Sequence, residues 1–171
     1  FDNGLTENVT ITLAKEQQYT VAFWAQNPNC TAYTTTDLKN VTVDYAGLNN
    51  DETRDAFFKA ETFTVTGNTE IDVVLKRPFA QINVGVYQSD WEAAVASEIE
   101  IEKSKATIEK AATSINLLTG EVAGEQTVEY GFDIIPAKFE TPETLDVDLD
   151  KDGTKENYVY LSMSYILAND T

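Results

Sequence analysis

The residues of this chain best suited to chemistry are carboxylates, and their densest run lies near the C-terminal end. From Asp146 to Gly153 the sequence is Asp-Val-Asp-Leu-Asp-Lys-Asp-Gly, so carboxylates alternate before a glycine. Alternate carboxylates followed by a glycine turn can direct several oxygen atoms at one Ca²⁺ ion. The run Asp146–Asp152 is therefore a candidate calcium loop.

The match to a calcium loop is partial. If Asp148 is the first position of an EF-hand loop, the twelfth position is Val159, where such a loop needs a glutamate that binds through both oxygens. The alternative is a solvated strand face that runs into an Asp-Gly hairpin turn. Because the last ligand is missing, we favour the turn and assign no metal-ligating residue.

Catalytic chemistry lacks the side chains that it needs. The chain has no histidine, which removes the commonest general base and zinc ligand. Its single cysteine, Cys30, ends a turn at Asn27–Cys30, and we interpret it as an unpaired thiol near the surface, since no histidine lowers its pKa. No phosphate-binding Gly-x-x-x-x-Gly-Lys motif occurs among the 8 glycines.

A pair of carboxylates for glycoside hydrolysis is the remaining catalytic option. Among 29 acidic residues, pairs at a suitable distance arise by chance, and acidic residues on strands normally keep a surface soluble. A hydrolase is therefore the least favoured hypothesis. We expect a protein that is not an enzyme and has no catalytic residue, no cofactor and no metal site.

The charge of the chain argues against two classes of partner. The 29 acidic and 12 basic residues give a net charge of −17. A negative field of this size repels phosphate backbones and anionic lipid surfaces. We therefore expect no binding to nucleic acid and no electrostatic binding to membranes. No apolar run approaches the roughly 18–20 residues of a membrane-spanning helix.

The elements that position these residues are organised around the segment 76–84. It contains the only adjacent basic pair, Lys76 and Arg77, and joins two alternating runs at Pro78, a residue that suits the junction between strands. One interpretation of the basic pair is a trypsin-like processing site. The other is a strand end whose charges meet neighbouring carboxylates, which we favour because cleavage needs an exposed, flexible segment.

Alternation of apolar and polar residues predicts most of the chain to be strand. The run 19–25 is apolar on both faces, with Tyr19, Val21 and Phe23 opposite Trp24, which indicates a central strand. A turn at Gly67-Asn68 predicts a hairpin between 63–65 and 71–75. The other predicted strands are 9–13, 41–43, 80–86, 98–102, 108, 115–118, 128–135, 145–149 and 159–167.

One helix interrupts this pattern. Ser89 and Glu92 have the spacing of a capping box, and Trp91, Ala94 and Val95 then share one helical face. The segment 51–60 is interpreted as a helical or irregular turn packed by two phenylalanines, Phe57 and Phe58.

About ten to twelve strands, one helix and no parallel crossover pattern predict an antiparallel β-sandwich. With 171 residues and 18 aromatic side chains, one core is expected, so residues 1–171 form a single domain. The chain begins at Phe1, and we expect it to be part of a longer precursor.

Five segments in the same order resemble the fimbrillin-like surface lipoproteins of gut Bacteroides, a family of type V pilus subunits. The segments are 21–25, 50–58, 76–84, 117–122 and 160–167. The resemblance implies a transthyretin-like β-sandwich of the fimbrillin N-terminal type. It also implies export as a lipoprotein to the outer membrane and the cell surface, where the protein is a pilus subunit, a pilus anchor or an adhesin for cell adhesion in the fimbrium.

The expected mode of assembly follows from this resemblance. A sandwich that lacks its terminal strand accepts a strand from another pilus subunit or from a second copy of itself. The carboxylates of Glu98, Glu100 and Glu102 mark an edge that discourages other pairings. Membrane contact is expected only through a lipid anchor upstream of this chain. The alternative is a monomeric surface lipoprotein that binds carbohydrate or glycoprotein, with Trp24 or Tyr160 stacking on sugar rings.

Overall fold

The computed structural model describes residues 8–35, 37, 39–48, 51–132, 148, 151–155 and 157–167. Within these residues the paired strands are all antiparallel, and one α-helix, α1 (Gln88–Ala96), is present beside a 3₁₀ turn, η1 (Glu52–Arg54). The predicted all-β fold with one short helix is confirmed. The strands are β1 (Gln18–Gln26), β2 (Tyr33–Thr34), β3 (Asn40–Val43), β4 (Ala56–Thr64), β5 (Phe79–Tyr87), β6 (Ala106–Ala111), β7 (Ser114–Asn116), β8 (Val122–Ala123), β9 (Gln126–Tyr130) and β10 (Tyr158–Leu167).

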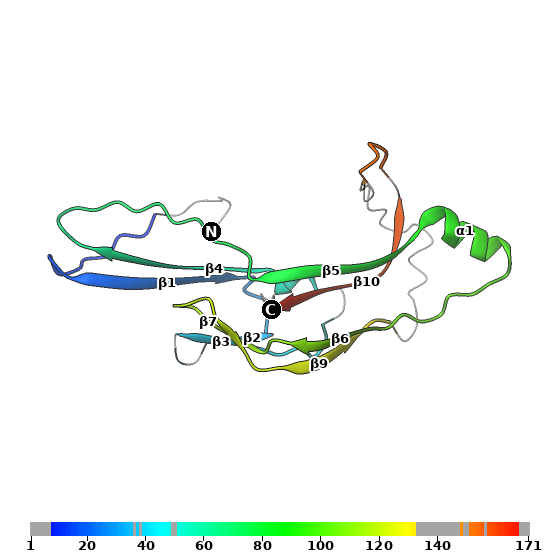
Figure 1. Ribbon diagram of the computed structural model, residues 1–171, viewed down its shortest axis with the longest axis horizontal. Coiled ribbons are helices and arrows are strands. Elements are labelled where there is room, and N and C mark those ends of the chain that lie inside the picture. Colours follow the sequence, from blue (N-terminus) through cyan, green and yellow to red (C-terminus); the bar gives the residue numbers. More distant parts are fainter. Residues whose placement is uncertain are drawn as a thin grey trace.

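The strands lie in two layers (Figure 1). One layer holds the pairs β1–β4 and β5–β10, and the other holds the sheet β2-β3-β7-β8 and the pair β6–β9. The molecule is elongated, with the free end of β1–β4 at one side of the view and α1 at the other. The core lies between the layers.

The core follows the alternation read from the sequence. Val41 of β3 and Ile115 of β7 are 0% and 2% exposed, and Val128 and Tyr130 of β9 point inward with them. Leu167 of β10 closes the same cluster at 2% exposure. The strands predicted at 41–43, 115–118, 128–135 and 159–167 are confirmed at β3, β7, β9 and β10, as far as the structure describes them. The predicted strand 145–149 and residues 133–135 fall outside the described residues, apart from Asp148.

Three predicted strands are wrong. The runs 9–13, 71–75 and 98–102 alternate as strands do, yet none of them forms a ladder. In the first run, Val9 and Ile11 are 75% and 55% exposed, so their alternation serves no buried face. The predicted hairpin 63–75 is absent because β4 pairs along nine residues with β1, and the returning chain keeps only one bridge, Phe58 with Lys76.

The segment 51–60, predicted as a helical or irregular turn, is such a turn only in its first half, and its second half, from Ala56 on, belongs to β4. Only η1 is helical, and its N-cap, Asp51, accepts a hydrogen bond from the Thr53 N–H at 3.1 Å. Phe57 and Phe58 are neighbours in β4 and therefore lie on opposite faces of it. Phe58 faces the core, and its ring lies over Gly120, where an added Cβ atom would stand 3.6 Å away.

The predicted helix is confirmed, but its predicted cap is wrong. The N-cap of α1 is Tyr87, which makes no side-chain capping hydrogen bond. Because the helix begins at Gln88, Ser89 lies inside it. Glu92 accepts a hydrogen bond from Gln88 Nε2 at 2.8 Å instead of completing a capping box.

The chain reverses direction after α1 at Glu98, whose backbone has a left-handed conformation. Ile99 N–H donates to Ala94 O at 2.9 Å and Glu98 N–H to Val95 O at 3.0 Å, which is the hydrogen-bond pattern of a Schellman cap. Glu98 occupies the position that glycine usually takes, with φ of 58°. An L-residue is strained there because its Cβ approaches the backbone. The turn places Ile99 beside the last turn of the helix.

Replacing Glu98 by glycine should therefore raise the free energy of unfolding by about 1 kcal/mol, because glycine adopts this conformation without strain. Urea denaturation measures the change. The matched control is Glu100→Gly, which removes the same charge from a position with no positive φ and should give no gain. Equal effects of the two substitutions would contradict the assignment of strain to Glu98.

Candidate functional site

β1 and β4 form a two-stranded ribbon that reaches away from the rest of the molecule (Figure 1). Their register runs from Gln18 opposite Thr64 to Gln26 opposite Ala56. Toward its free end the ribbon is polar on one face, where the Thr20 and Thr62 hydroxyls meet at 2.8 Å. On the other face the rings of Tyr19 and Phe63 lie 6.5 Å apart.

The backbone of β1 presents unpaired groups on the side away from β4. Phe58 exchanges both of its backbone hydrogen bonds with Lys76, at 2.9 and 3.0 Å, on the far side of β4. Its cross-strand partner Trp24 is therefore a non-hydrogen-bonded partner, and the Trp24 N–H and C=O point away from β4. The backbone N–H and C=O groups at every second residue from Trp24 also point away from β4. These residues are Gln18, Thr20, Ala22 and Gln26.

In the described part of the chain, no strand pairs with this open side of β1. Among the described strands β1 thus lies at an edge and not at the centre of a sheet, as was predicted for 19–25, while the predicted facing of its side chains is confirmed. The sequence Gln-Tyr-Thr-Val-Ala-Phe-Trp-Ala-Gln contains no charge, no proline and no glycine. Edge strands usually carry such residues because they prevent pairing with other chains. Within the part of the chain that the structure describes, β1 is therefore a long edge strand without this protection.

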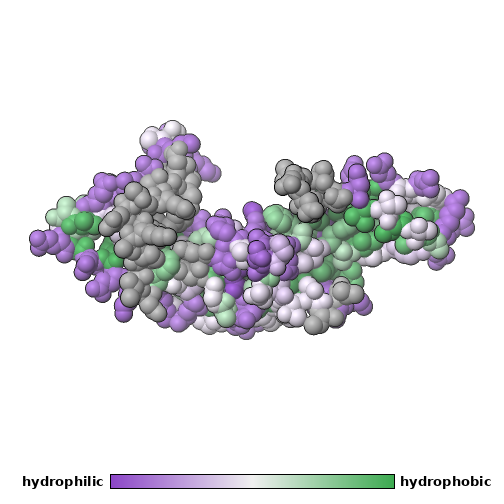
Figure 2. Space-filling view, turned by 180° about the vertical axis from the view of Figure 1, so that it is seen from behind, coloured by the Kyte–Doolittle hydropathy of each residue, from purple (hydrophilic) through white to green (hydrophobic). Residues whose placement is uncertain are grey.

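Both faces of β1 are apolar over its inner half. Ala22 and Trp24 pack against the core, and Phe23 and Val21 are half-buried on the opposite face. Figure 2 shows hydrophobic residues gathered at the end of the molecule that carries β1 and β4, on the right of that view. A strand added beside β1 would meet apolar side chains above and below.

Trp24 is held within the protein. Its Nε1–H donates to Gln26 Oε1 at 2.7 Å, and its ring meets Tyr33 edge-on at a centroid distance of 5.4 Å and Phe79 at 6.4 Å. The indole is therefore not a free platform for a sugar ring. The side chain of Tyr160, the other proposed platform, lies outside the described residues.

The charge of Arg77 in the basic pair meets a carboxylate, as the favoured interpretation predicts. Its Nε and one terminal nitrogen donate to the two Asp55 oxygens, both at 2.6 Å. These hydrogen bonds raise the pKa of Arg77. The guanidinium also lies 5.2 Å from the centre of the Phe57 ring. Lys76 is bound through its backbone to β4.

A second basic residue, Arg54, is buried at 4% exposure. It donates to Asp44 O at 2.7 Å, to Ala46 O and to Asp51 Oδ2 at 3.1 Å. Burial raises the pKa of Asp51, but hydrogen bonds from Thr53 and Arg54 outweigh it, so the pKa is lowered overall. Arg54 thereby ties η1 to the loop that follows β3. This role was not predicted from the sequence.

Two tyrosines complete the contacts of η1. Tyr33 donates to Arg54 O, and burial raises the pKa of its hydroxyl. Tyr165 of β10 donates to Glu52 Oε2 at 2.9 Å, and burial together with this carboxylate raises the pKa of Tyr165 to about 12. Both hydroxyls stay protonated at neutral pH. The cluster is suited to holding η1 in place.

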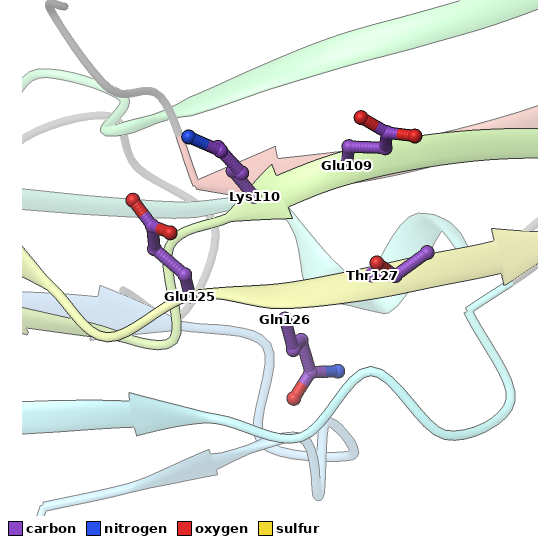
Figure 3. A pocket seen from close by; sticks show the side chains of 5 residues that line it. All are labelled: Glu109, Lys110, Glu125, Gln126 and Thr127. Carbon is purple, nitrogen blue, oxygen red and sulfur yellow. The ribbon is translucent and has the colours of Figure 1, made fainter.

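A polar hollow of about 390 Å³ lies where β6 and β9 change register. Its lining residues are Glu109, Lys110, Glu125, Gln126 and Thr127. Figure 3 shows that these side chains do not converge, since Gln126 points away from Glu109 and Lys110. The hollow follows from a β-bulge, in which extra residues on β6 stand opposite fewer on β9. It provides no acid and base directed at one point.

The described residues of the acidic run form a turn. Asp148 Oδ2 accepts a hydrogen bond from Gly153 N–H at 3.0 Å, and Asp152 Oδ1 accepts one from Thr154 N–H at 2.7 Å. Asp146 and Asp150 lie outside the described residues. Among the residues that are described, no three acidic, cysteine or histidine side chains are placed to hold a metal ion.

The sequence predicted that Cys30 lies near the surface, and this prediction is wrong. The residue is buried, at 7% exposure. Its N–H donates to Asn27 O at 3.0 Å and its carbonyl accepts from Gln26 Nε2 at 3.2 Å. The turn at Asn27–Cys30 folds the thiol inward, which explains the difference.

The comparisons with known proteins concern the whole chain. No helix in the described residues has the length and apolar character needed to cross a membrane. Neither a curated protein nor a solved structure matches the sequence. One family profile matches residues 2–171. The chain therefore belongs to DUF6562, a family of unknown function.

Proposed function

We propose that this protein is a non-enzymatic, fimbrillin-like surface protein that assembles by β-strand addition at the open side of β1. One observation carries the proposal: in the described structure β1 is a nine-residue strand at the edge of its sheet, and it has no charged residue. Its outward N–H and C=O groups recur at alternate residues, and an added strand would pair with them. The partner is another pilus subunit or a second copy of this protein.

The chemistry of β1 favours an apolar, extended donor. Each added backbone hydrogen bond contributes about 1 kcal/mol net. Side chains of the donor would alternate between the core-side face, near Ala22 and Trp24, and the face of Val21 and Phe23. Because each partner side chain gains apolar contact, such a donor adds specificity to the ladder.

β5 is the other nine-residue strand without a charge and with one described partner. It is less suited to accept a strand. Gln81 and Asn83 leave one of its faces polar and exposed, and Gly85 contributes no side chain. A strand beside β5 would therefore gain apolar contact on one face only.

The cell-surface setting of the proposal rests on the fimbrillin resemblance of the five segments described above. In that setting the protein is exported as a lipoprotein and serves as pilus subunit, pilus anchor or adhesin. The large excess of acidic residues is compatible with an exported protein, since net charge keeps proteins soluble.

A proline substitution on β1 tests the proposal. Thr20→Pro removes an outward N–H and leaves the ladder to β4 in place, because the Thr20 N–H does not face β4. We expect the natural full-length protein, treated with a trypsin-like protease, to form polymers, and the Thr20→Pro variant to stay monomeric. Light scattering measures the size of both.

The matched control is Thr62→Pro. It lies directly opposite Thr20 and loses the same contact between hydroxyls, but it leaves the open side of β1 unchanged. It should polymerise as the unmodified protein does. If the unmodified protein stays monomeric before and after cleavage, strand addition is wrong and a monomeric surface lipoprotein that binds carbohydrate or glycoprotein becomes the better account.

A further inference from the structure

The helix α1 lies at the end of the molecule opposite the free end of β1–β4 (Figure 1), and a second surface is formed by α1 and the residues that follow it. It is a hollow of about 400 Å³, which we call the α1 hollow. Its lining residues are Trp91, Val95, Glu98, Ile99, Glu100 and Ile101. Four of the six are apolar and two are carboxylates.

The apolar part of the α1 hollow is open to solvent. Val95 and Ile99 are 60% and 58% exposed, and α1 has no buried residue. A helix of nine residues is marginally stable alone, and burial of an apolar face normally stabilises it. The Schellman turn at Glu98 holds Ile99 against the helix end and extends the apolar surface beyond it. This arrangement serves contact with another molecule better than it serves the core.

The rim of the α1 hollow is negative and uncompensated. Glu98 and Glu100 follow the C-terminal end of α1, which itself carries partial negative charge, and no basic residue lies in the last helical turn. Among the described residues, neither carboxylate makes an ion pair. Glu102 continues the run before the first cation, Lys103. A cationic partner would relieve this repulsion.

We propose that the α1 hollow binds a cationic peptide segment of another protein, with an aliphatic or aromatic side chain seated in the hollow and lysines or arginines at the carboxylates. A second copy of this chain does not fit the site. The only adjacent basic pair in the sequence, Lys76–Arg77, has its arginine bound to Asp55 and is therefore not available to the carboxylates of the hollow. The inference is independent of strand addition at β1.

Fluorescence anisotropy with the labelled peptide Lys-Lys-Ile-Leu-Lys-Lys tests the site on the full chain. The double variant Val95→Ser, Ile99→Ser should bind at least about tenfold more weakly. The pair Glu98→Gln, Glu100→Gln should also bind more weakly and show a smaller salt dependence. Circular dichroism confirms that each variant keeps its fold.

The polar hollow supplies the matched control. It has a similar volume and also bears two carboxylates, so Glu109→Gln, Glu125→Gln changes the net charge equally and should leave peptide binding unchanged. Equal weakening by this pair would show attraction by net charge alone and overturn the proposal. Lack of peptide binding at millimolar concentration, or binding of phosphatidylcholine vesicles in its place, would overturn it as well.

Discussion

Replacing Arg54 by methionine is expected to lower the free energy of unfolding by about 3–5 kcal/mol. The arginine is 4% exposed and donates to the carbonyls of Asp44 and Ala46 and to the Asp51 carboxylate. Methionine fills much of the same volume but offers no donor, so a carboxylate and two carbonyls lose their charged partner in a poorly hydrated place. Chemical denaturation of the purified protein measures the loss.

Lys105→Met provides the comparison for this substitution. Lys105 also forms an ion pair, with Glu129 at 2.6 Å, but both side chains are more than half exposed. A solvated pair of this kind contributes about 0–1 kcal/mol. If Arg54→Met costs no more than Lys105→Met, the contacts of Arg54 do not hold η1 in place.

Replacing Gly131 by alanine is expected to lower the free energy of unfolding by about 3 kcal/mol or more. Its φ is 147°, and an added Cβ atom would stand 2.1 Å from Ser104 O, a backbone atom that cannot turn aside. Ser104 exchanges hydrogen bonds with Phe132 and donates through Oγ to Leu161 O at 2.8 Å. The substitution therefore separates the end of β9 from the chain that leads into β6, and weakens the attachment of both to β10.

Gly67→Ala is the control for Gly131→Ala. An added Cβ atom at Gly67 has no neighbour within 4 Å, and its φ is not in the positive range. This variant should have an unchanged or slightly higher free energy of unfolding, because alanine restricts the unfolded chain. Thermal unfolding of the two variants side by side decides the matter. Similar melting temperatures would mean that the backbone around Gly131 adjusts without cost.

The sequence predicted which side chains of a strand are buried better than it predicted which strands pair with each other. Alternation predicted the strands that contain Val41, Ile115 and Val128, and the structure buries these three side chains, because a buried face imposes a period of two. The same period says nothing about which backbone lies alongside. β1 looked central because both of its faces are apolar, and its open side became visible only from the bridge between Phe58 and Lys76.

The candidate sites were predictable to different degrees. The charge of Arg77 was expected to meet a carboxylate because it lies at a strand end, and Asp55 provides it. The burial of Arg54 was missed, since a single arginine in a polar segment has no periodic signal. Its spacing of three residues from Asp51, which caps η1, was the available clue. The α1 hollow depends on the left-handed backbone conformation of Glu98. This conformation was not predicted, because the alternation of residues 98–102 is typical of a strand.

Residue-resolved hydrogen exchange along β1 tests strand addition most directly. In the monomer, the amides of Thr20, Ala22 and Trp24 should exchange quickly, because they point away from β4, and those of Tyr19, Val21 and Phe23 should exchange slowly. Assembly should protect the first set and erase the alternation. If Thr20, Ala22 and Trp24 exchange as quickly in the assembled protein as in the monomer, no strand is added at β1 and the account is contradicted.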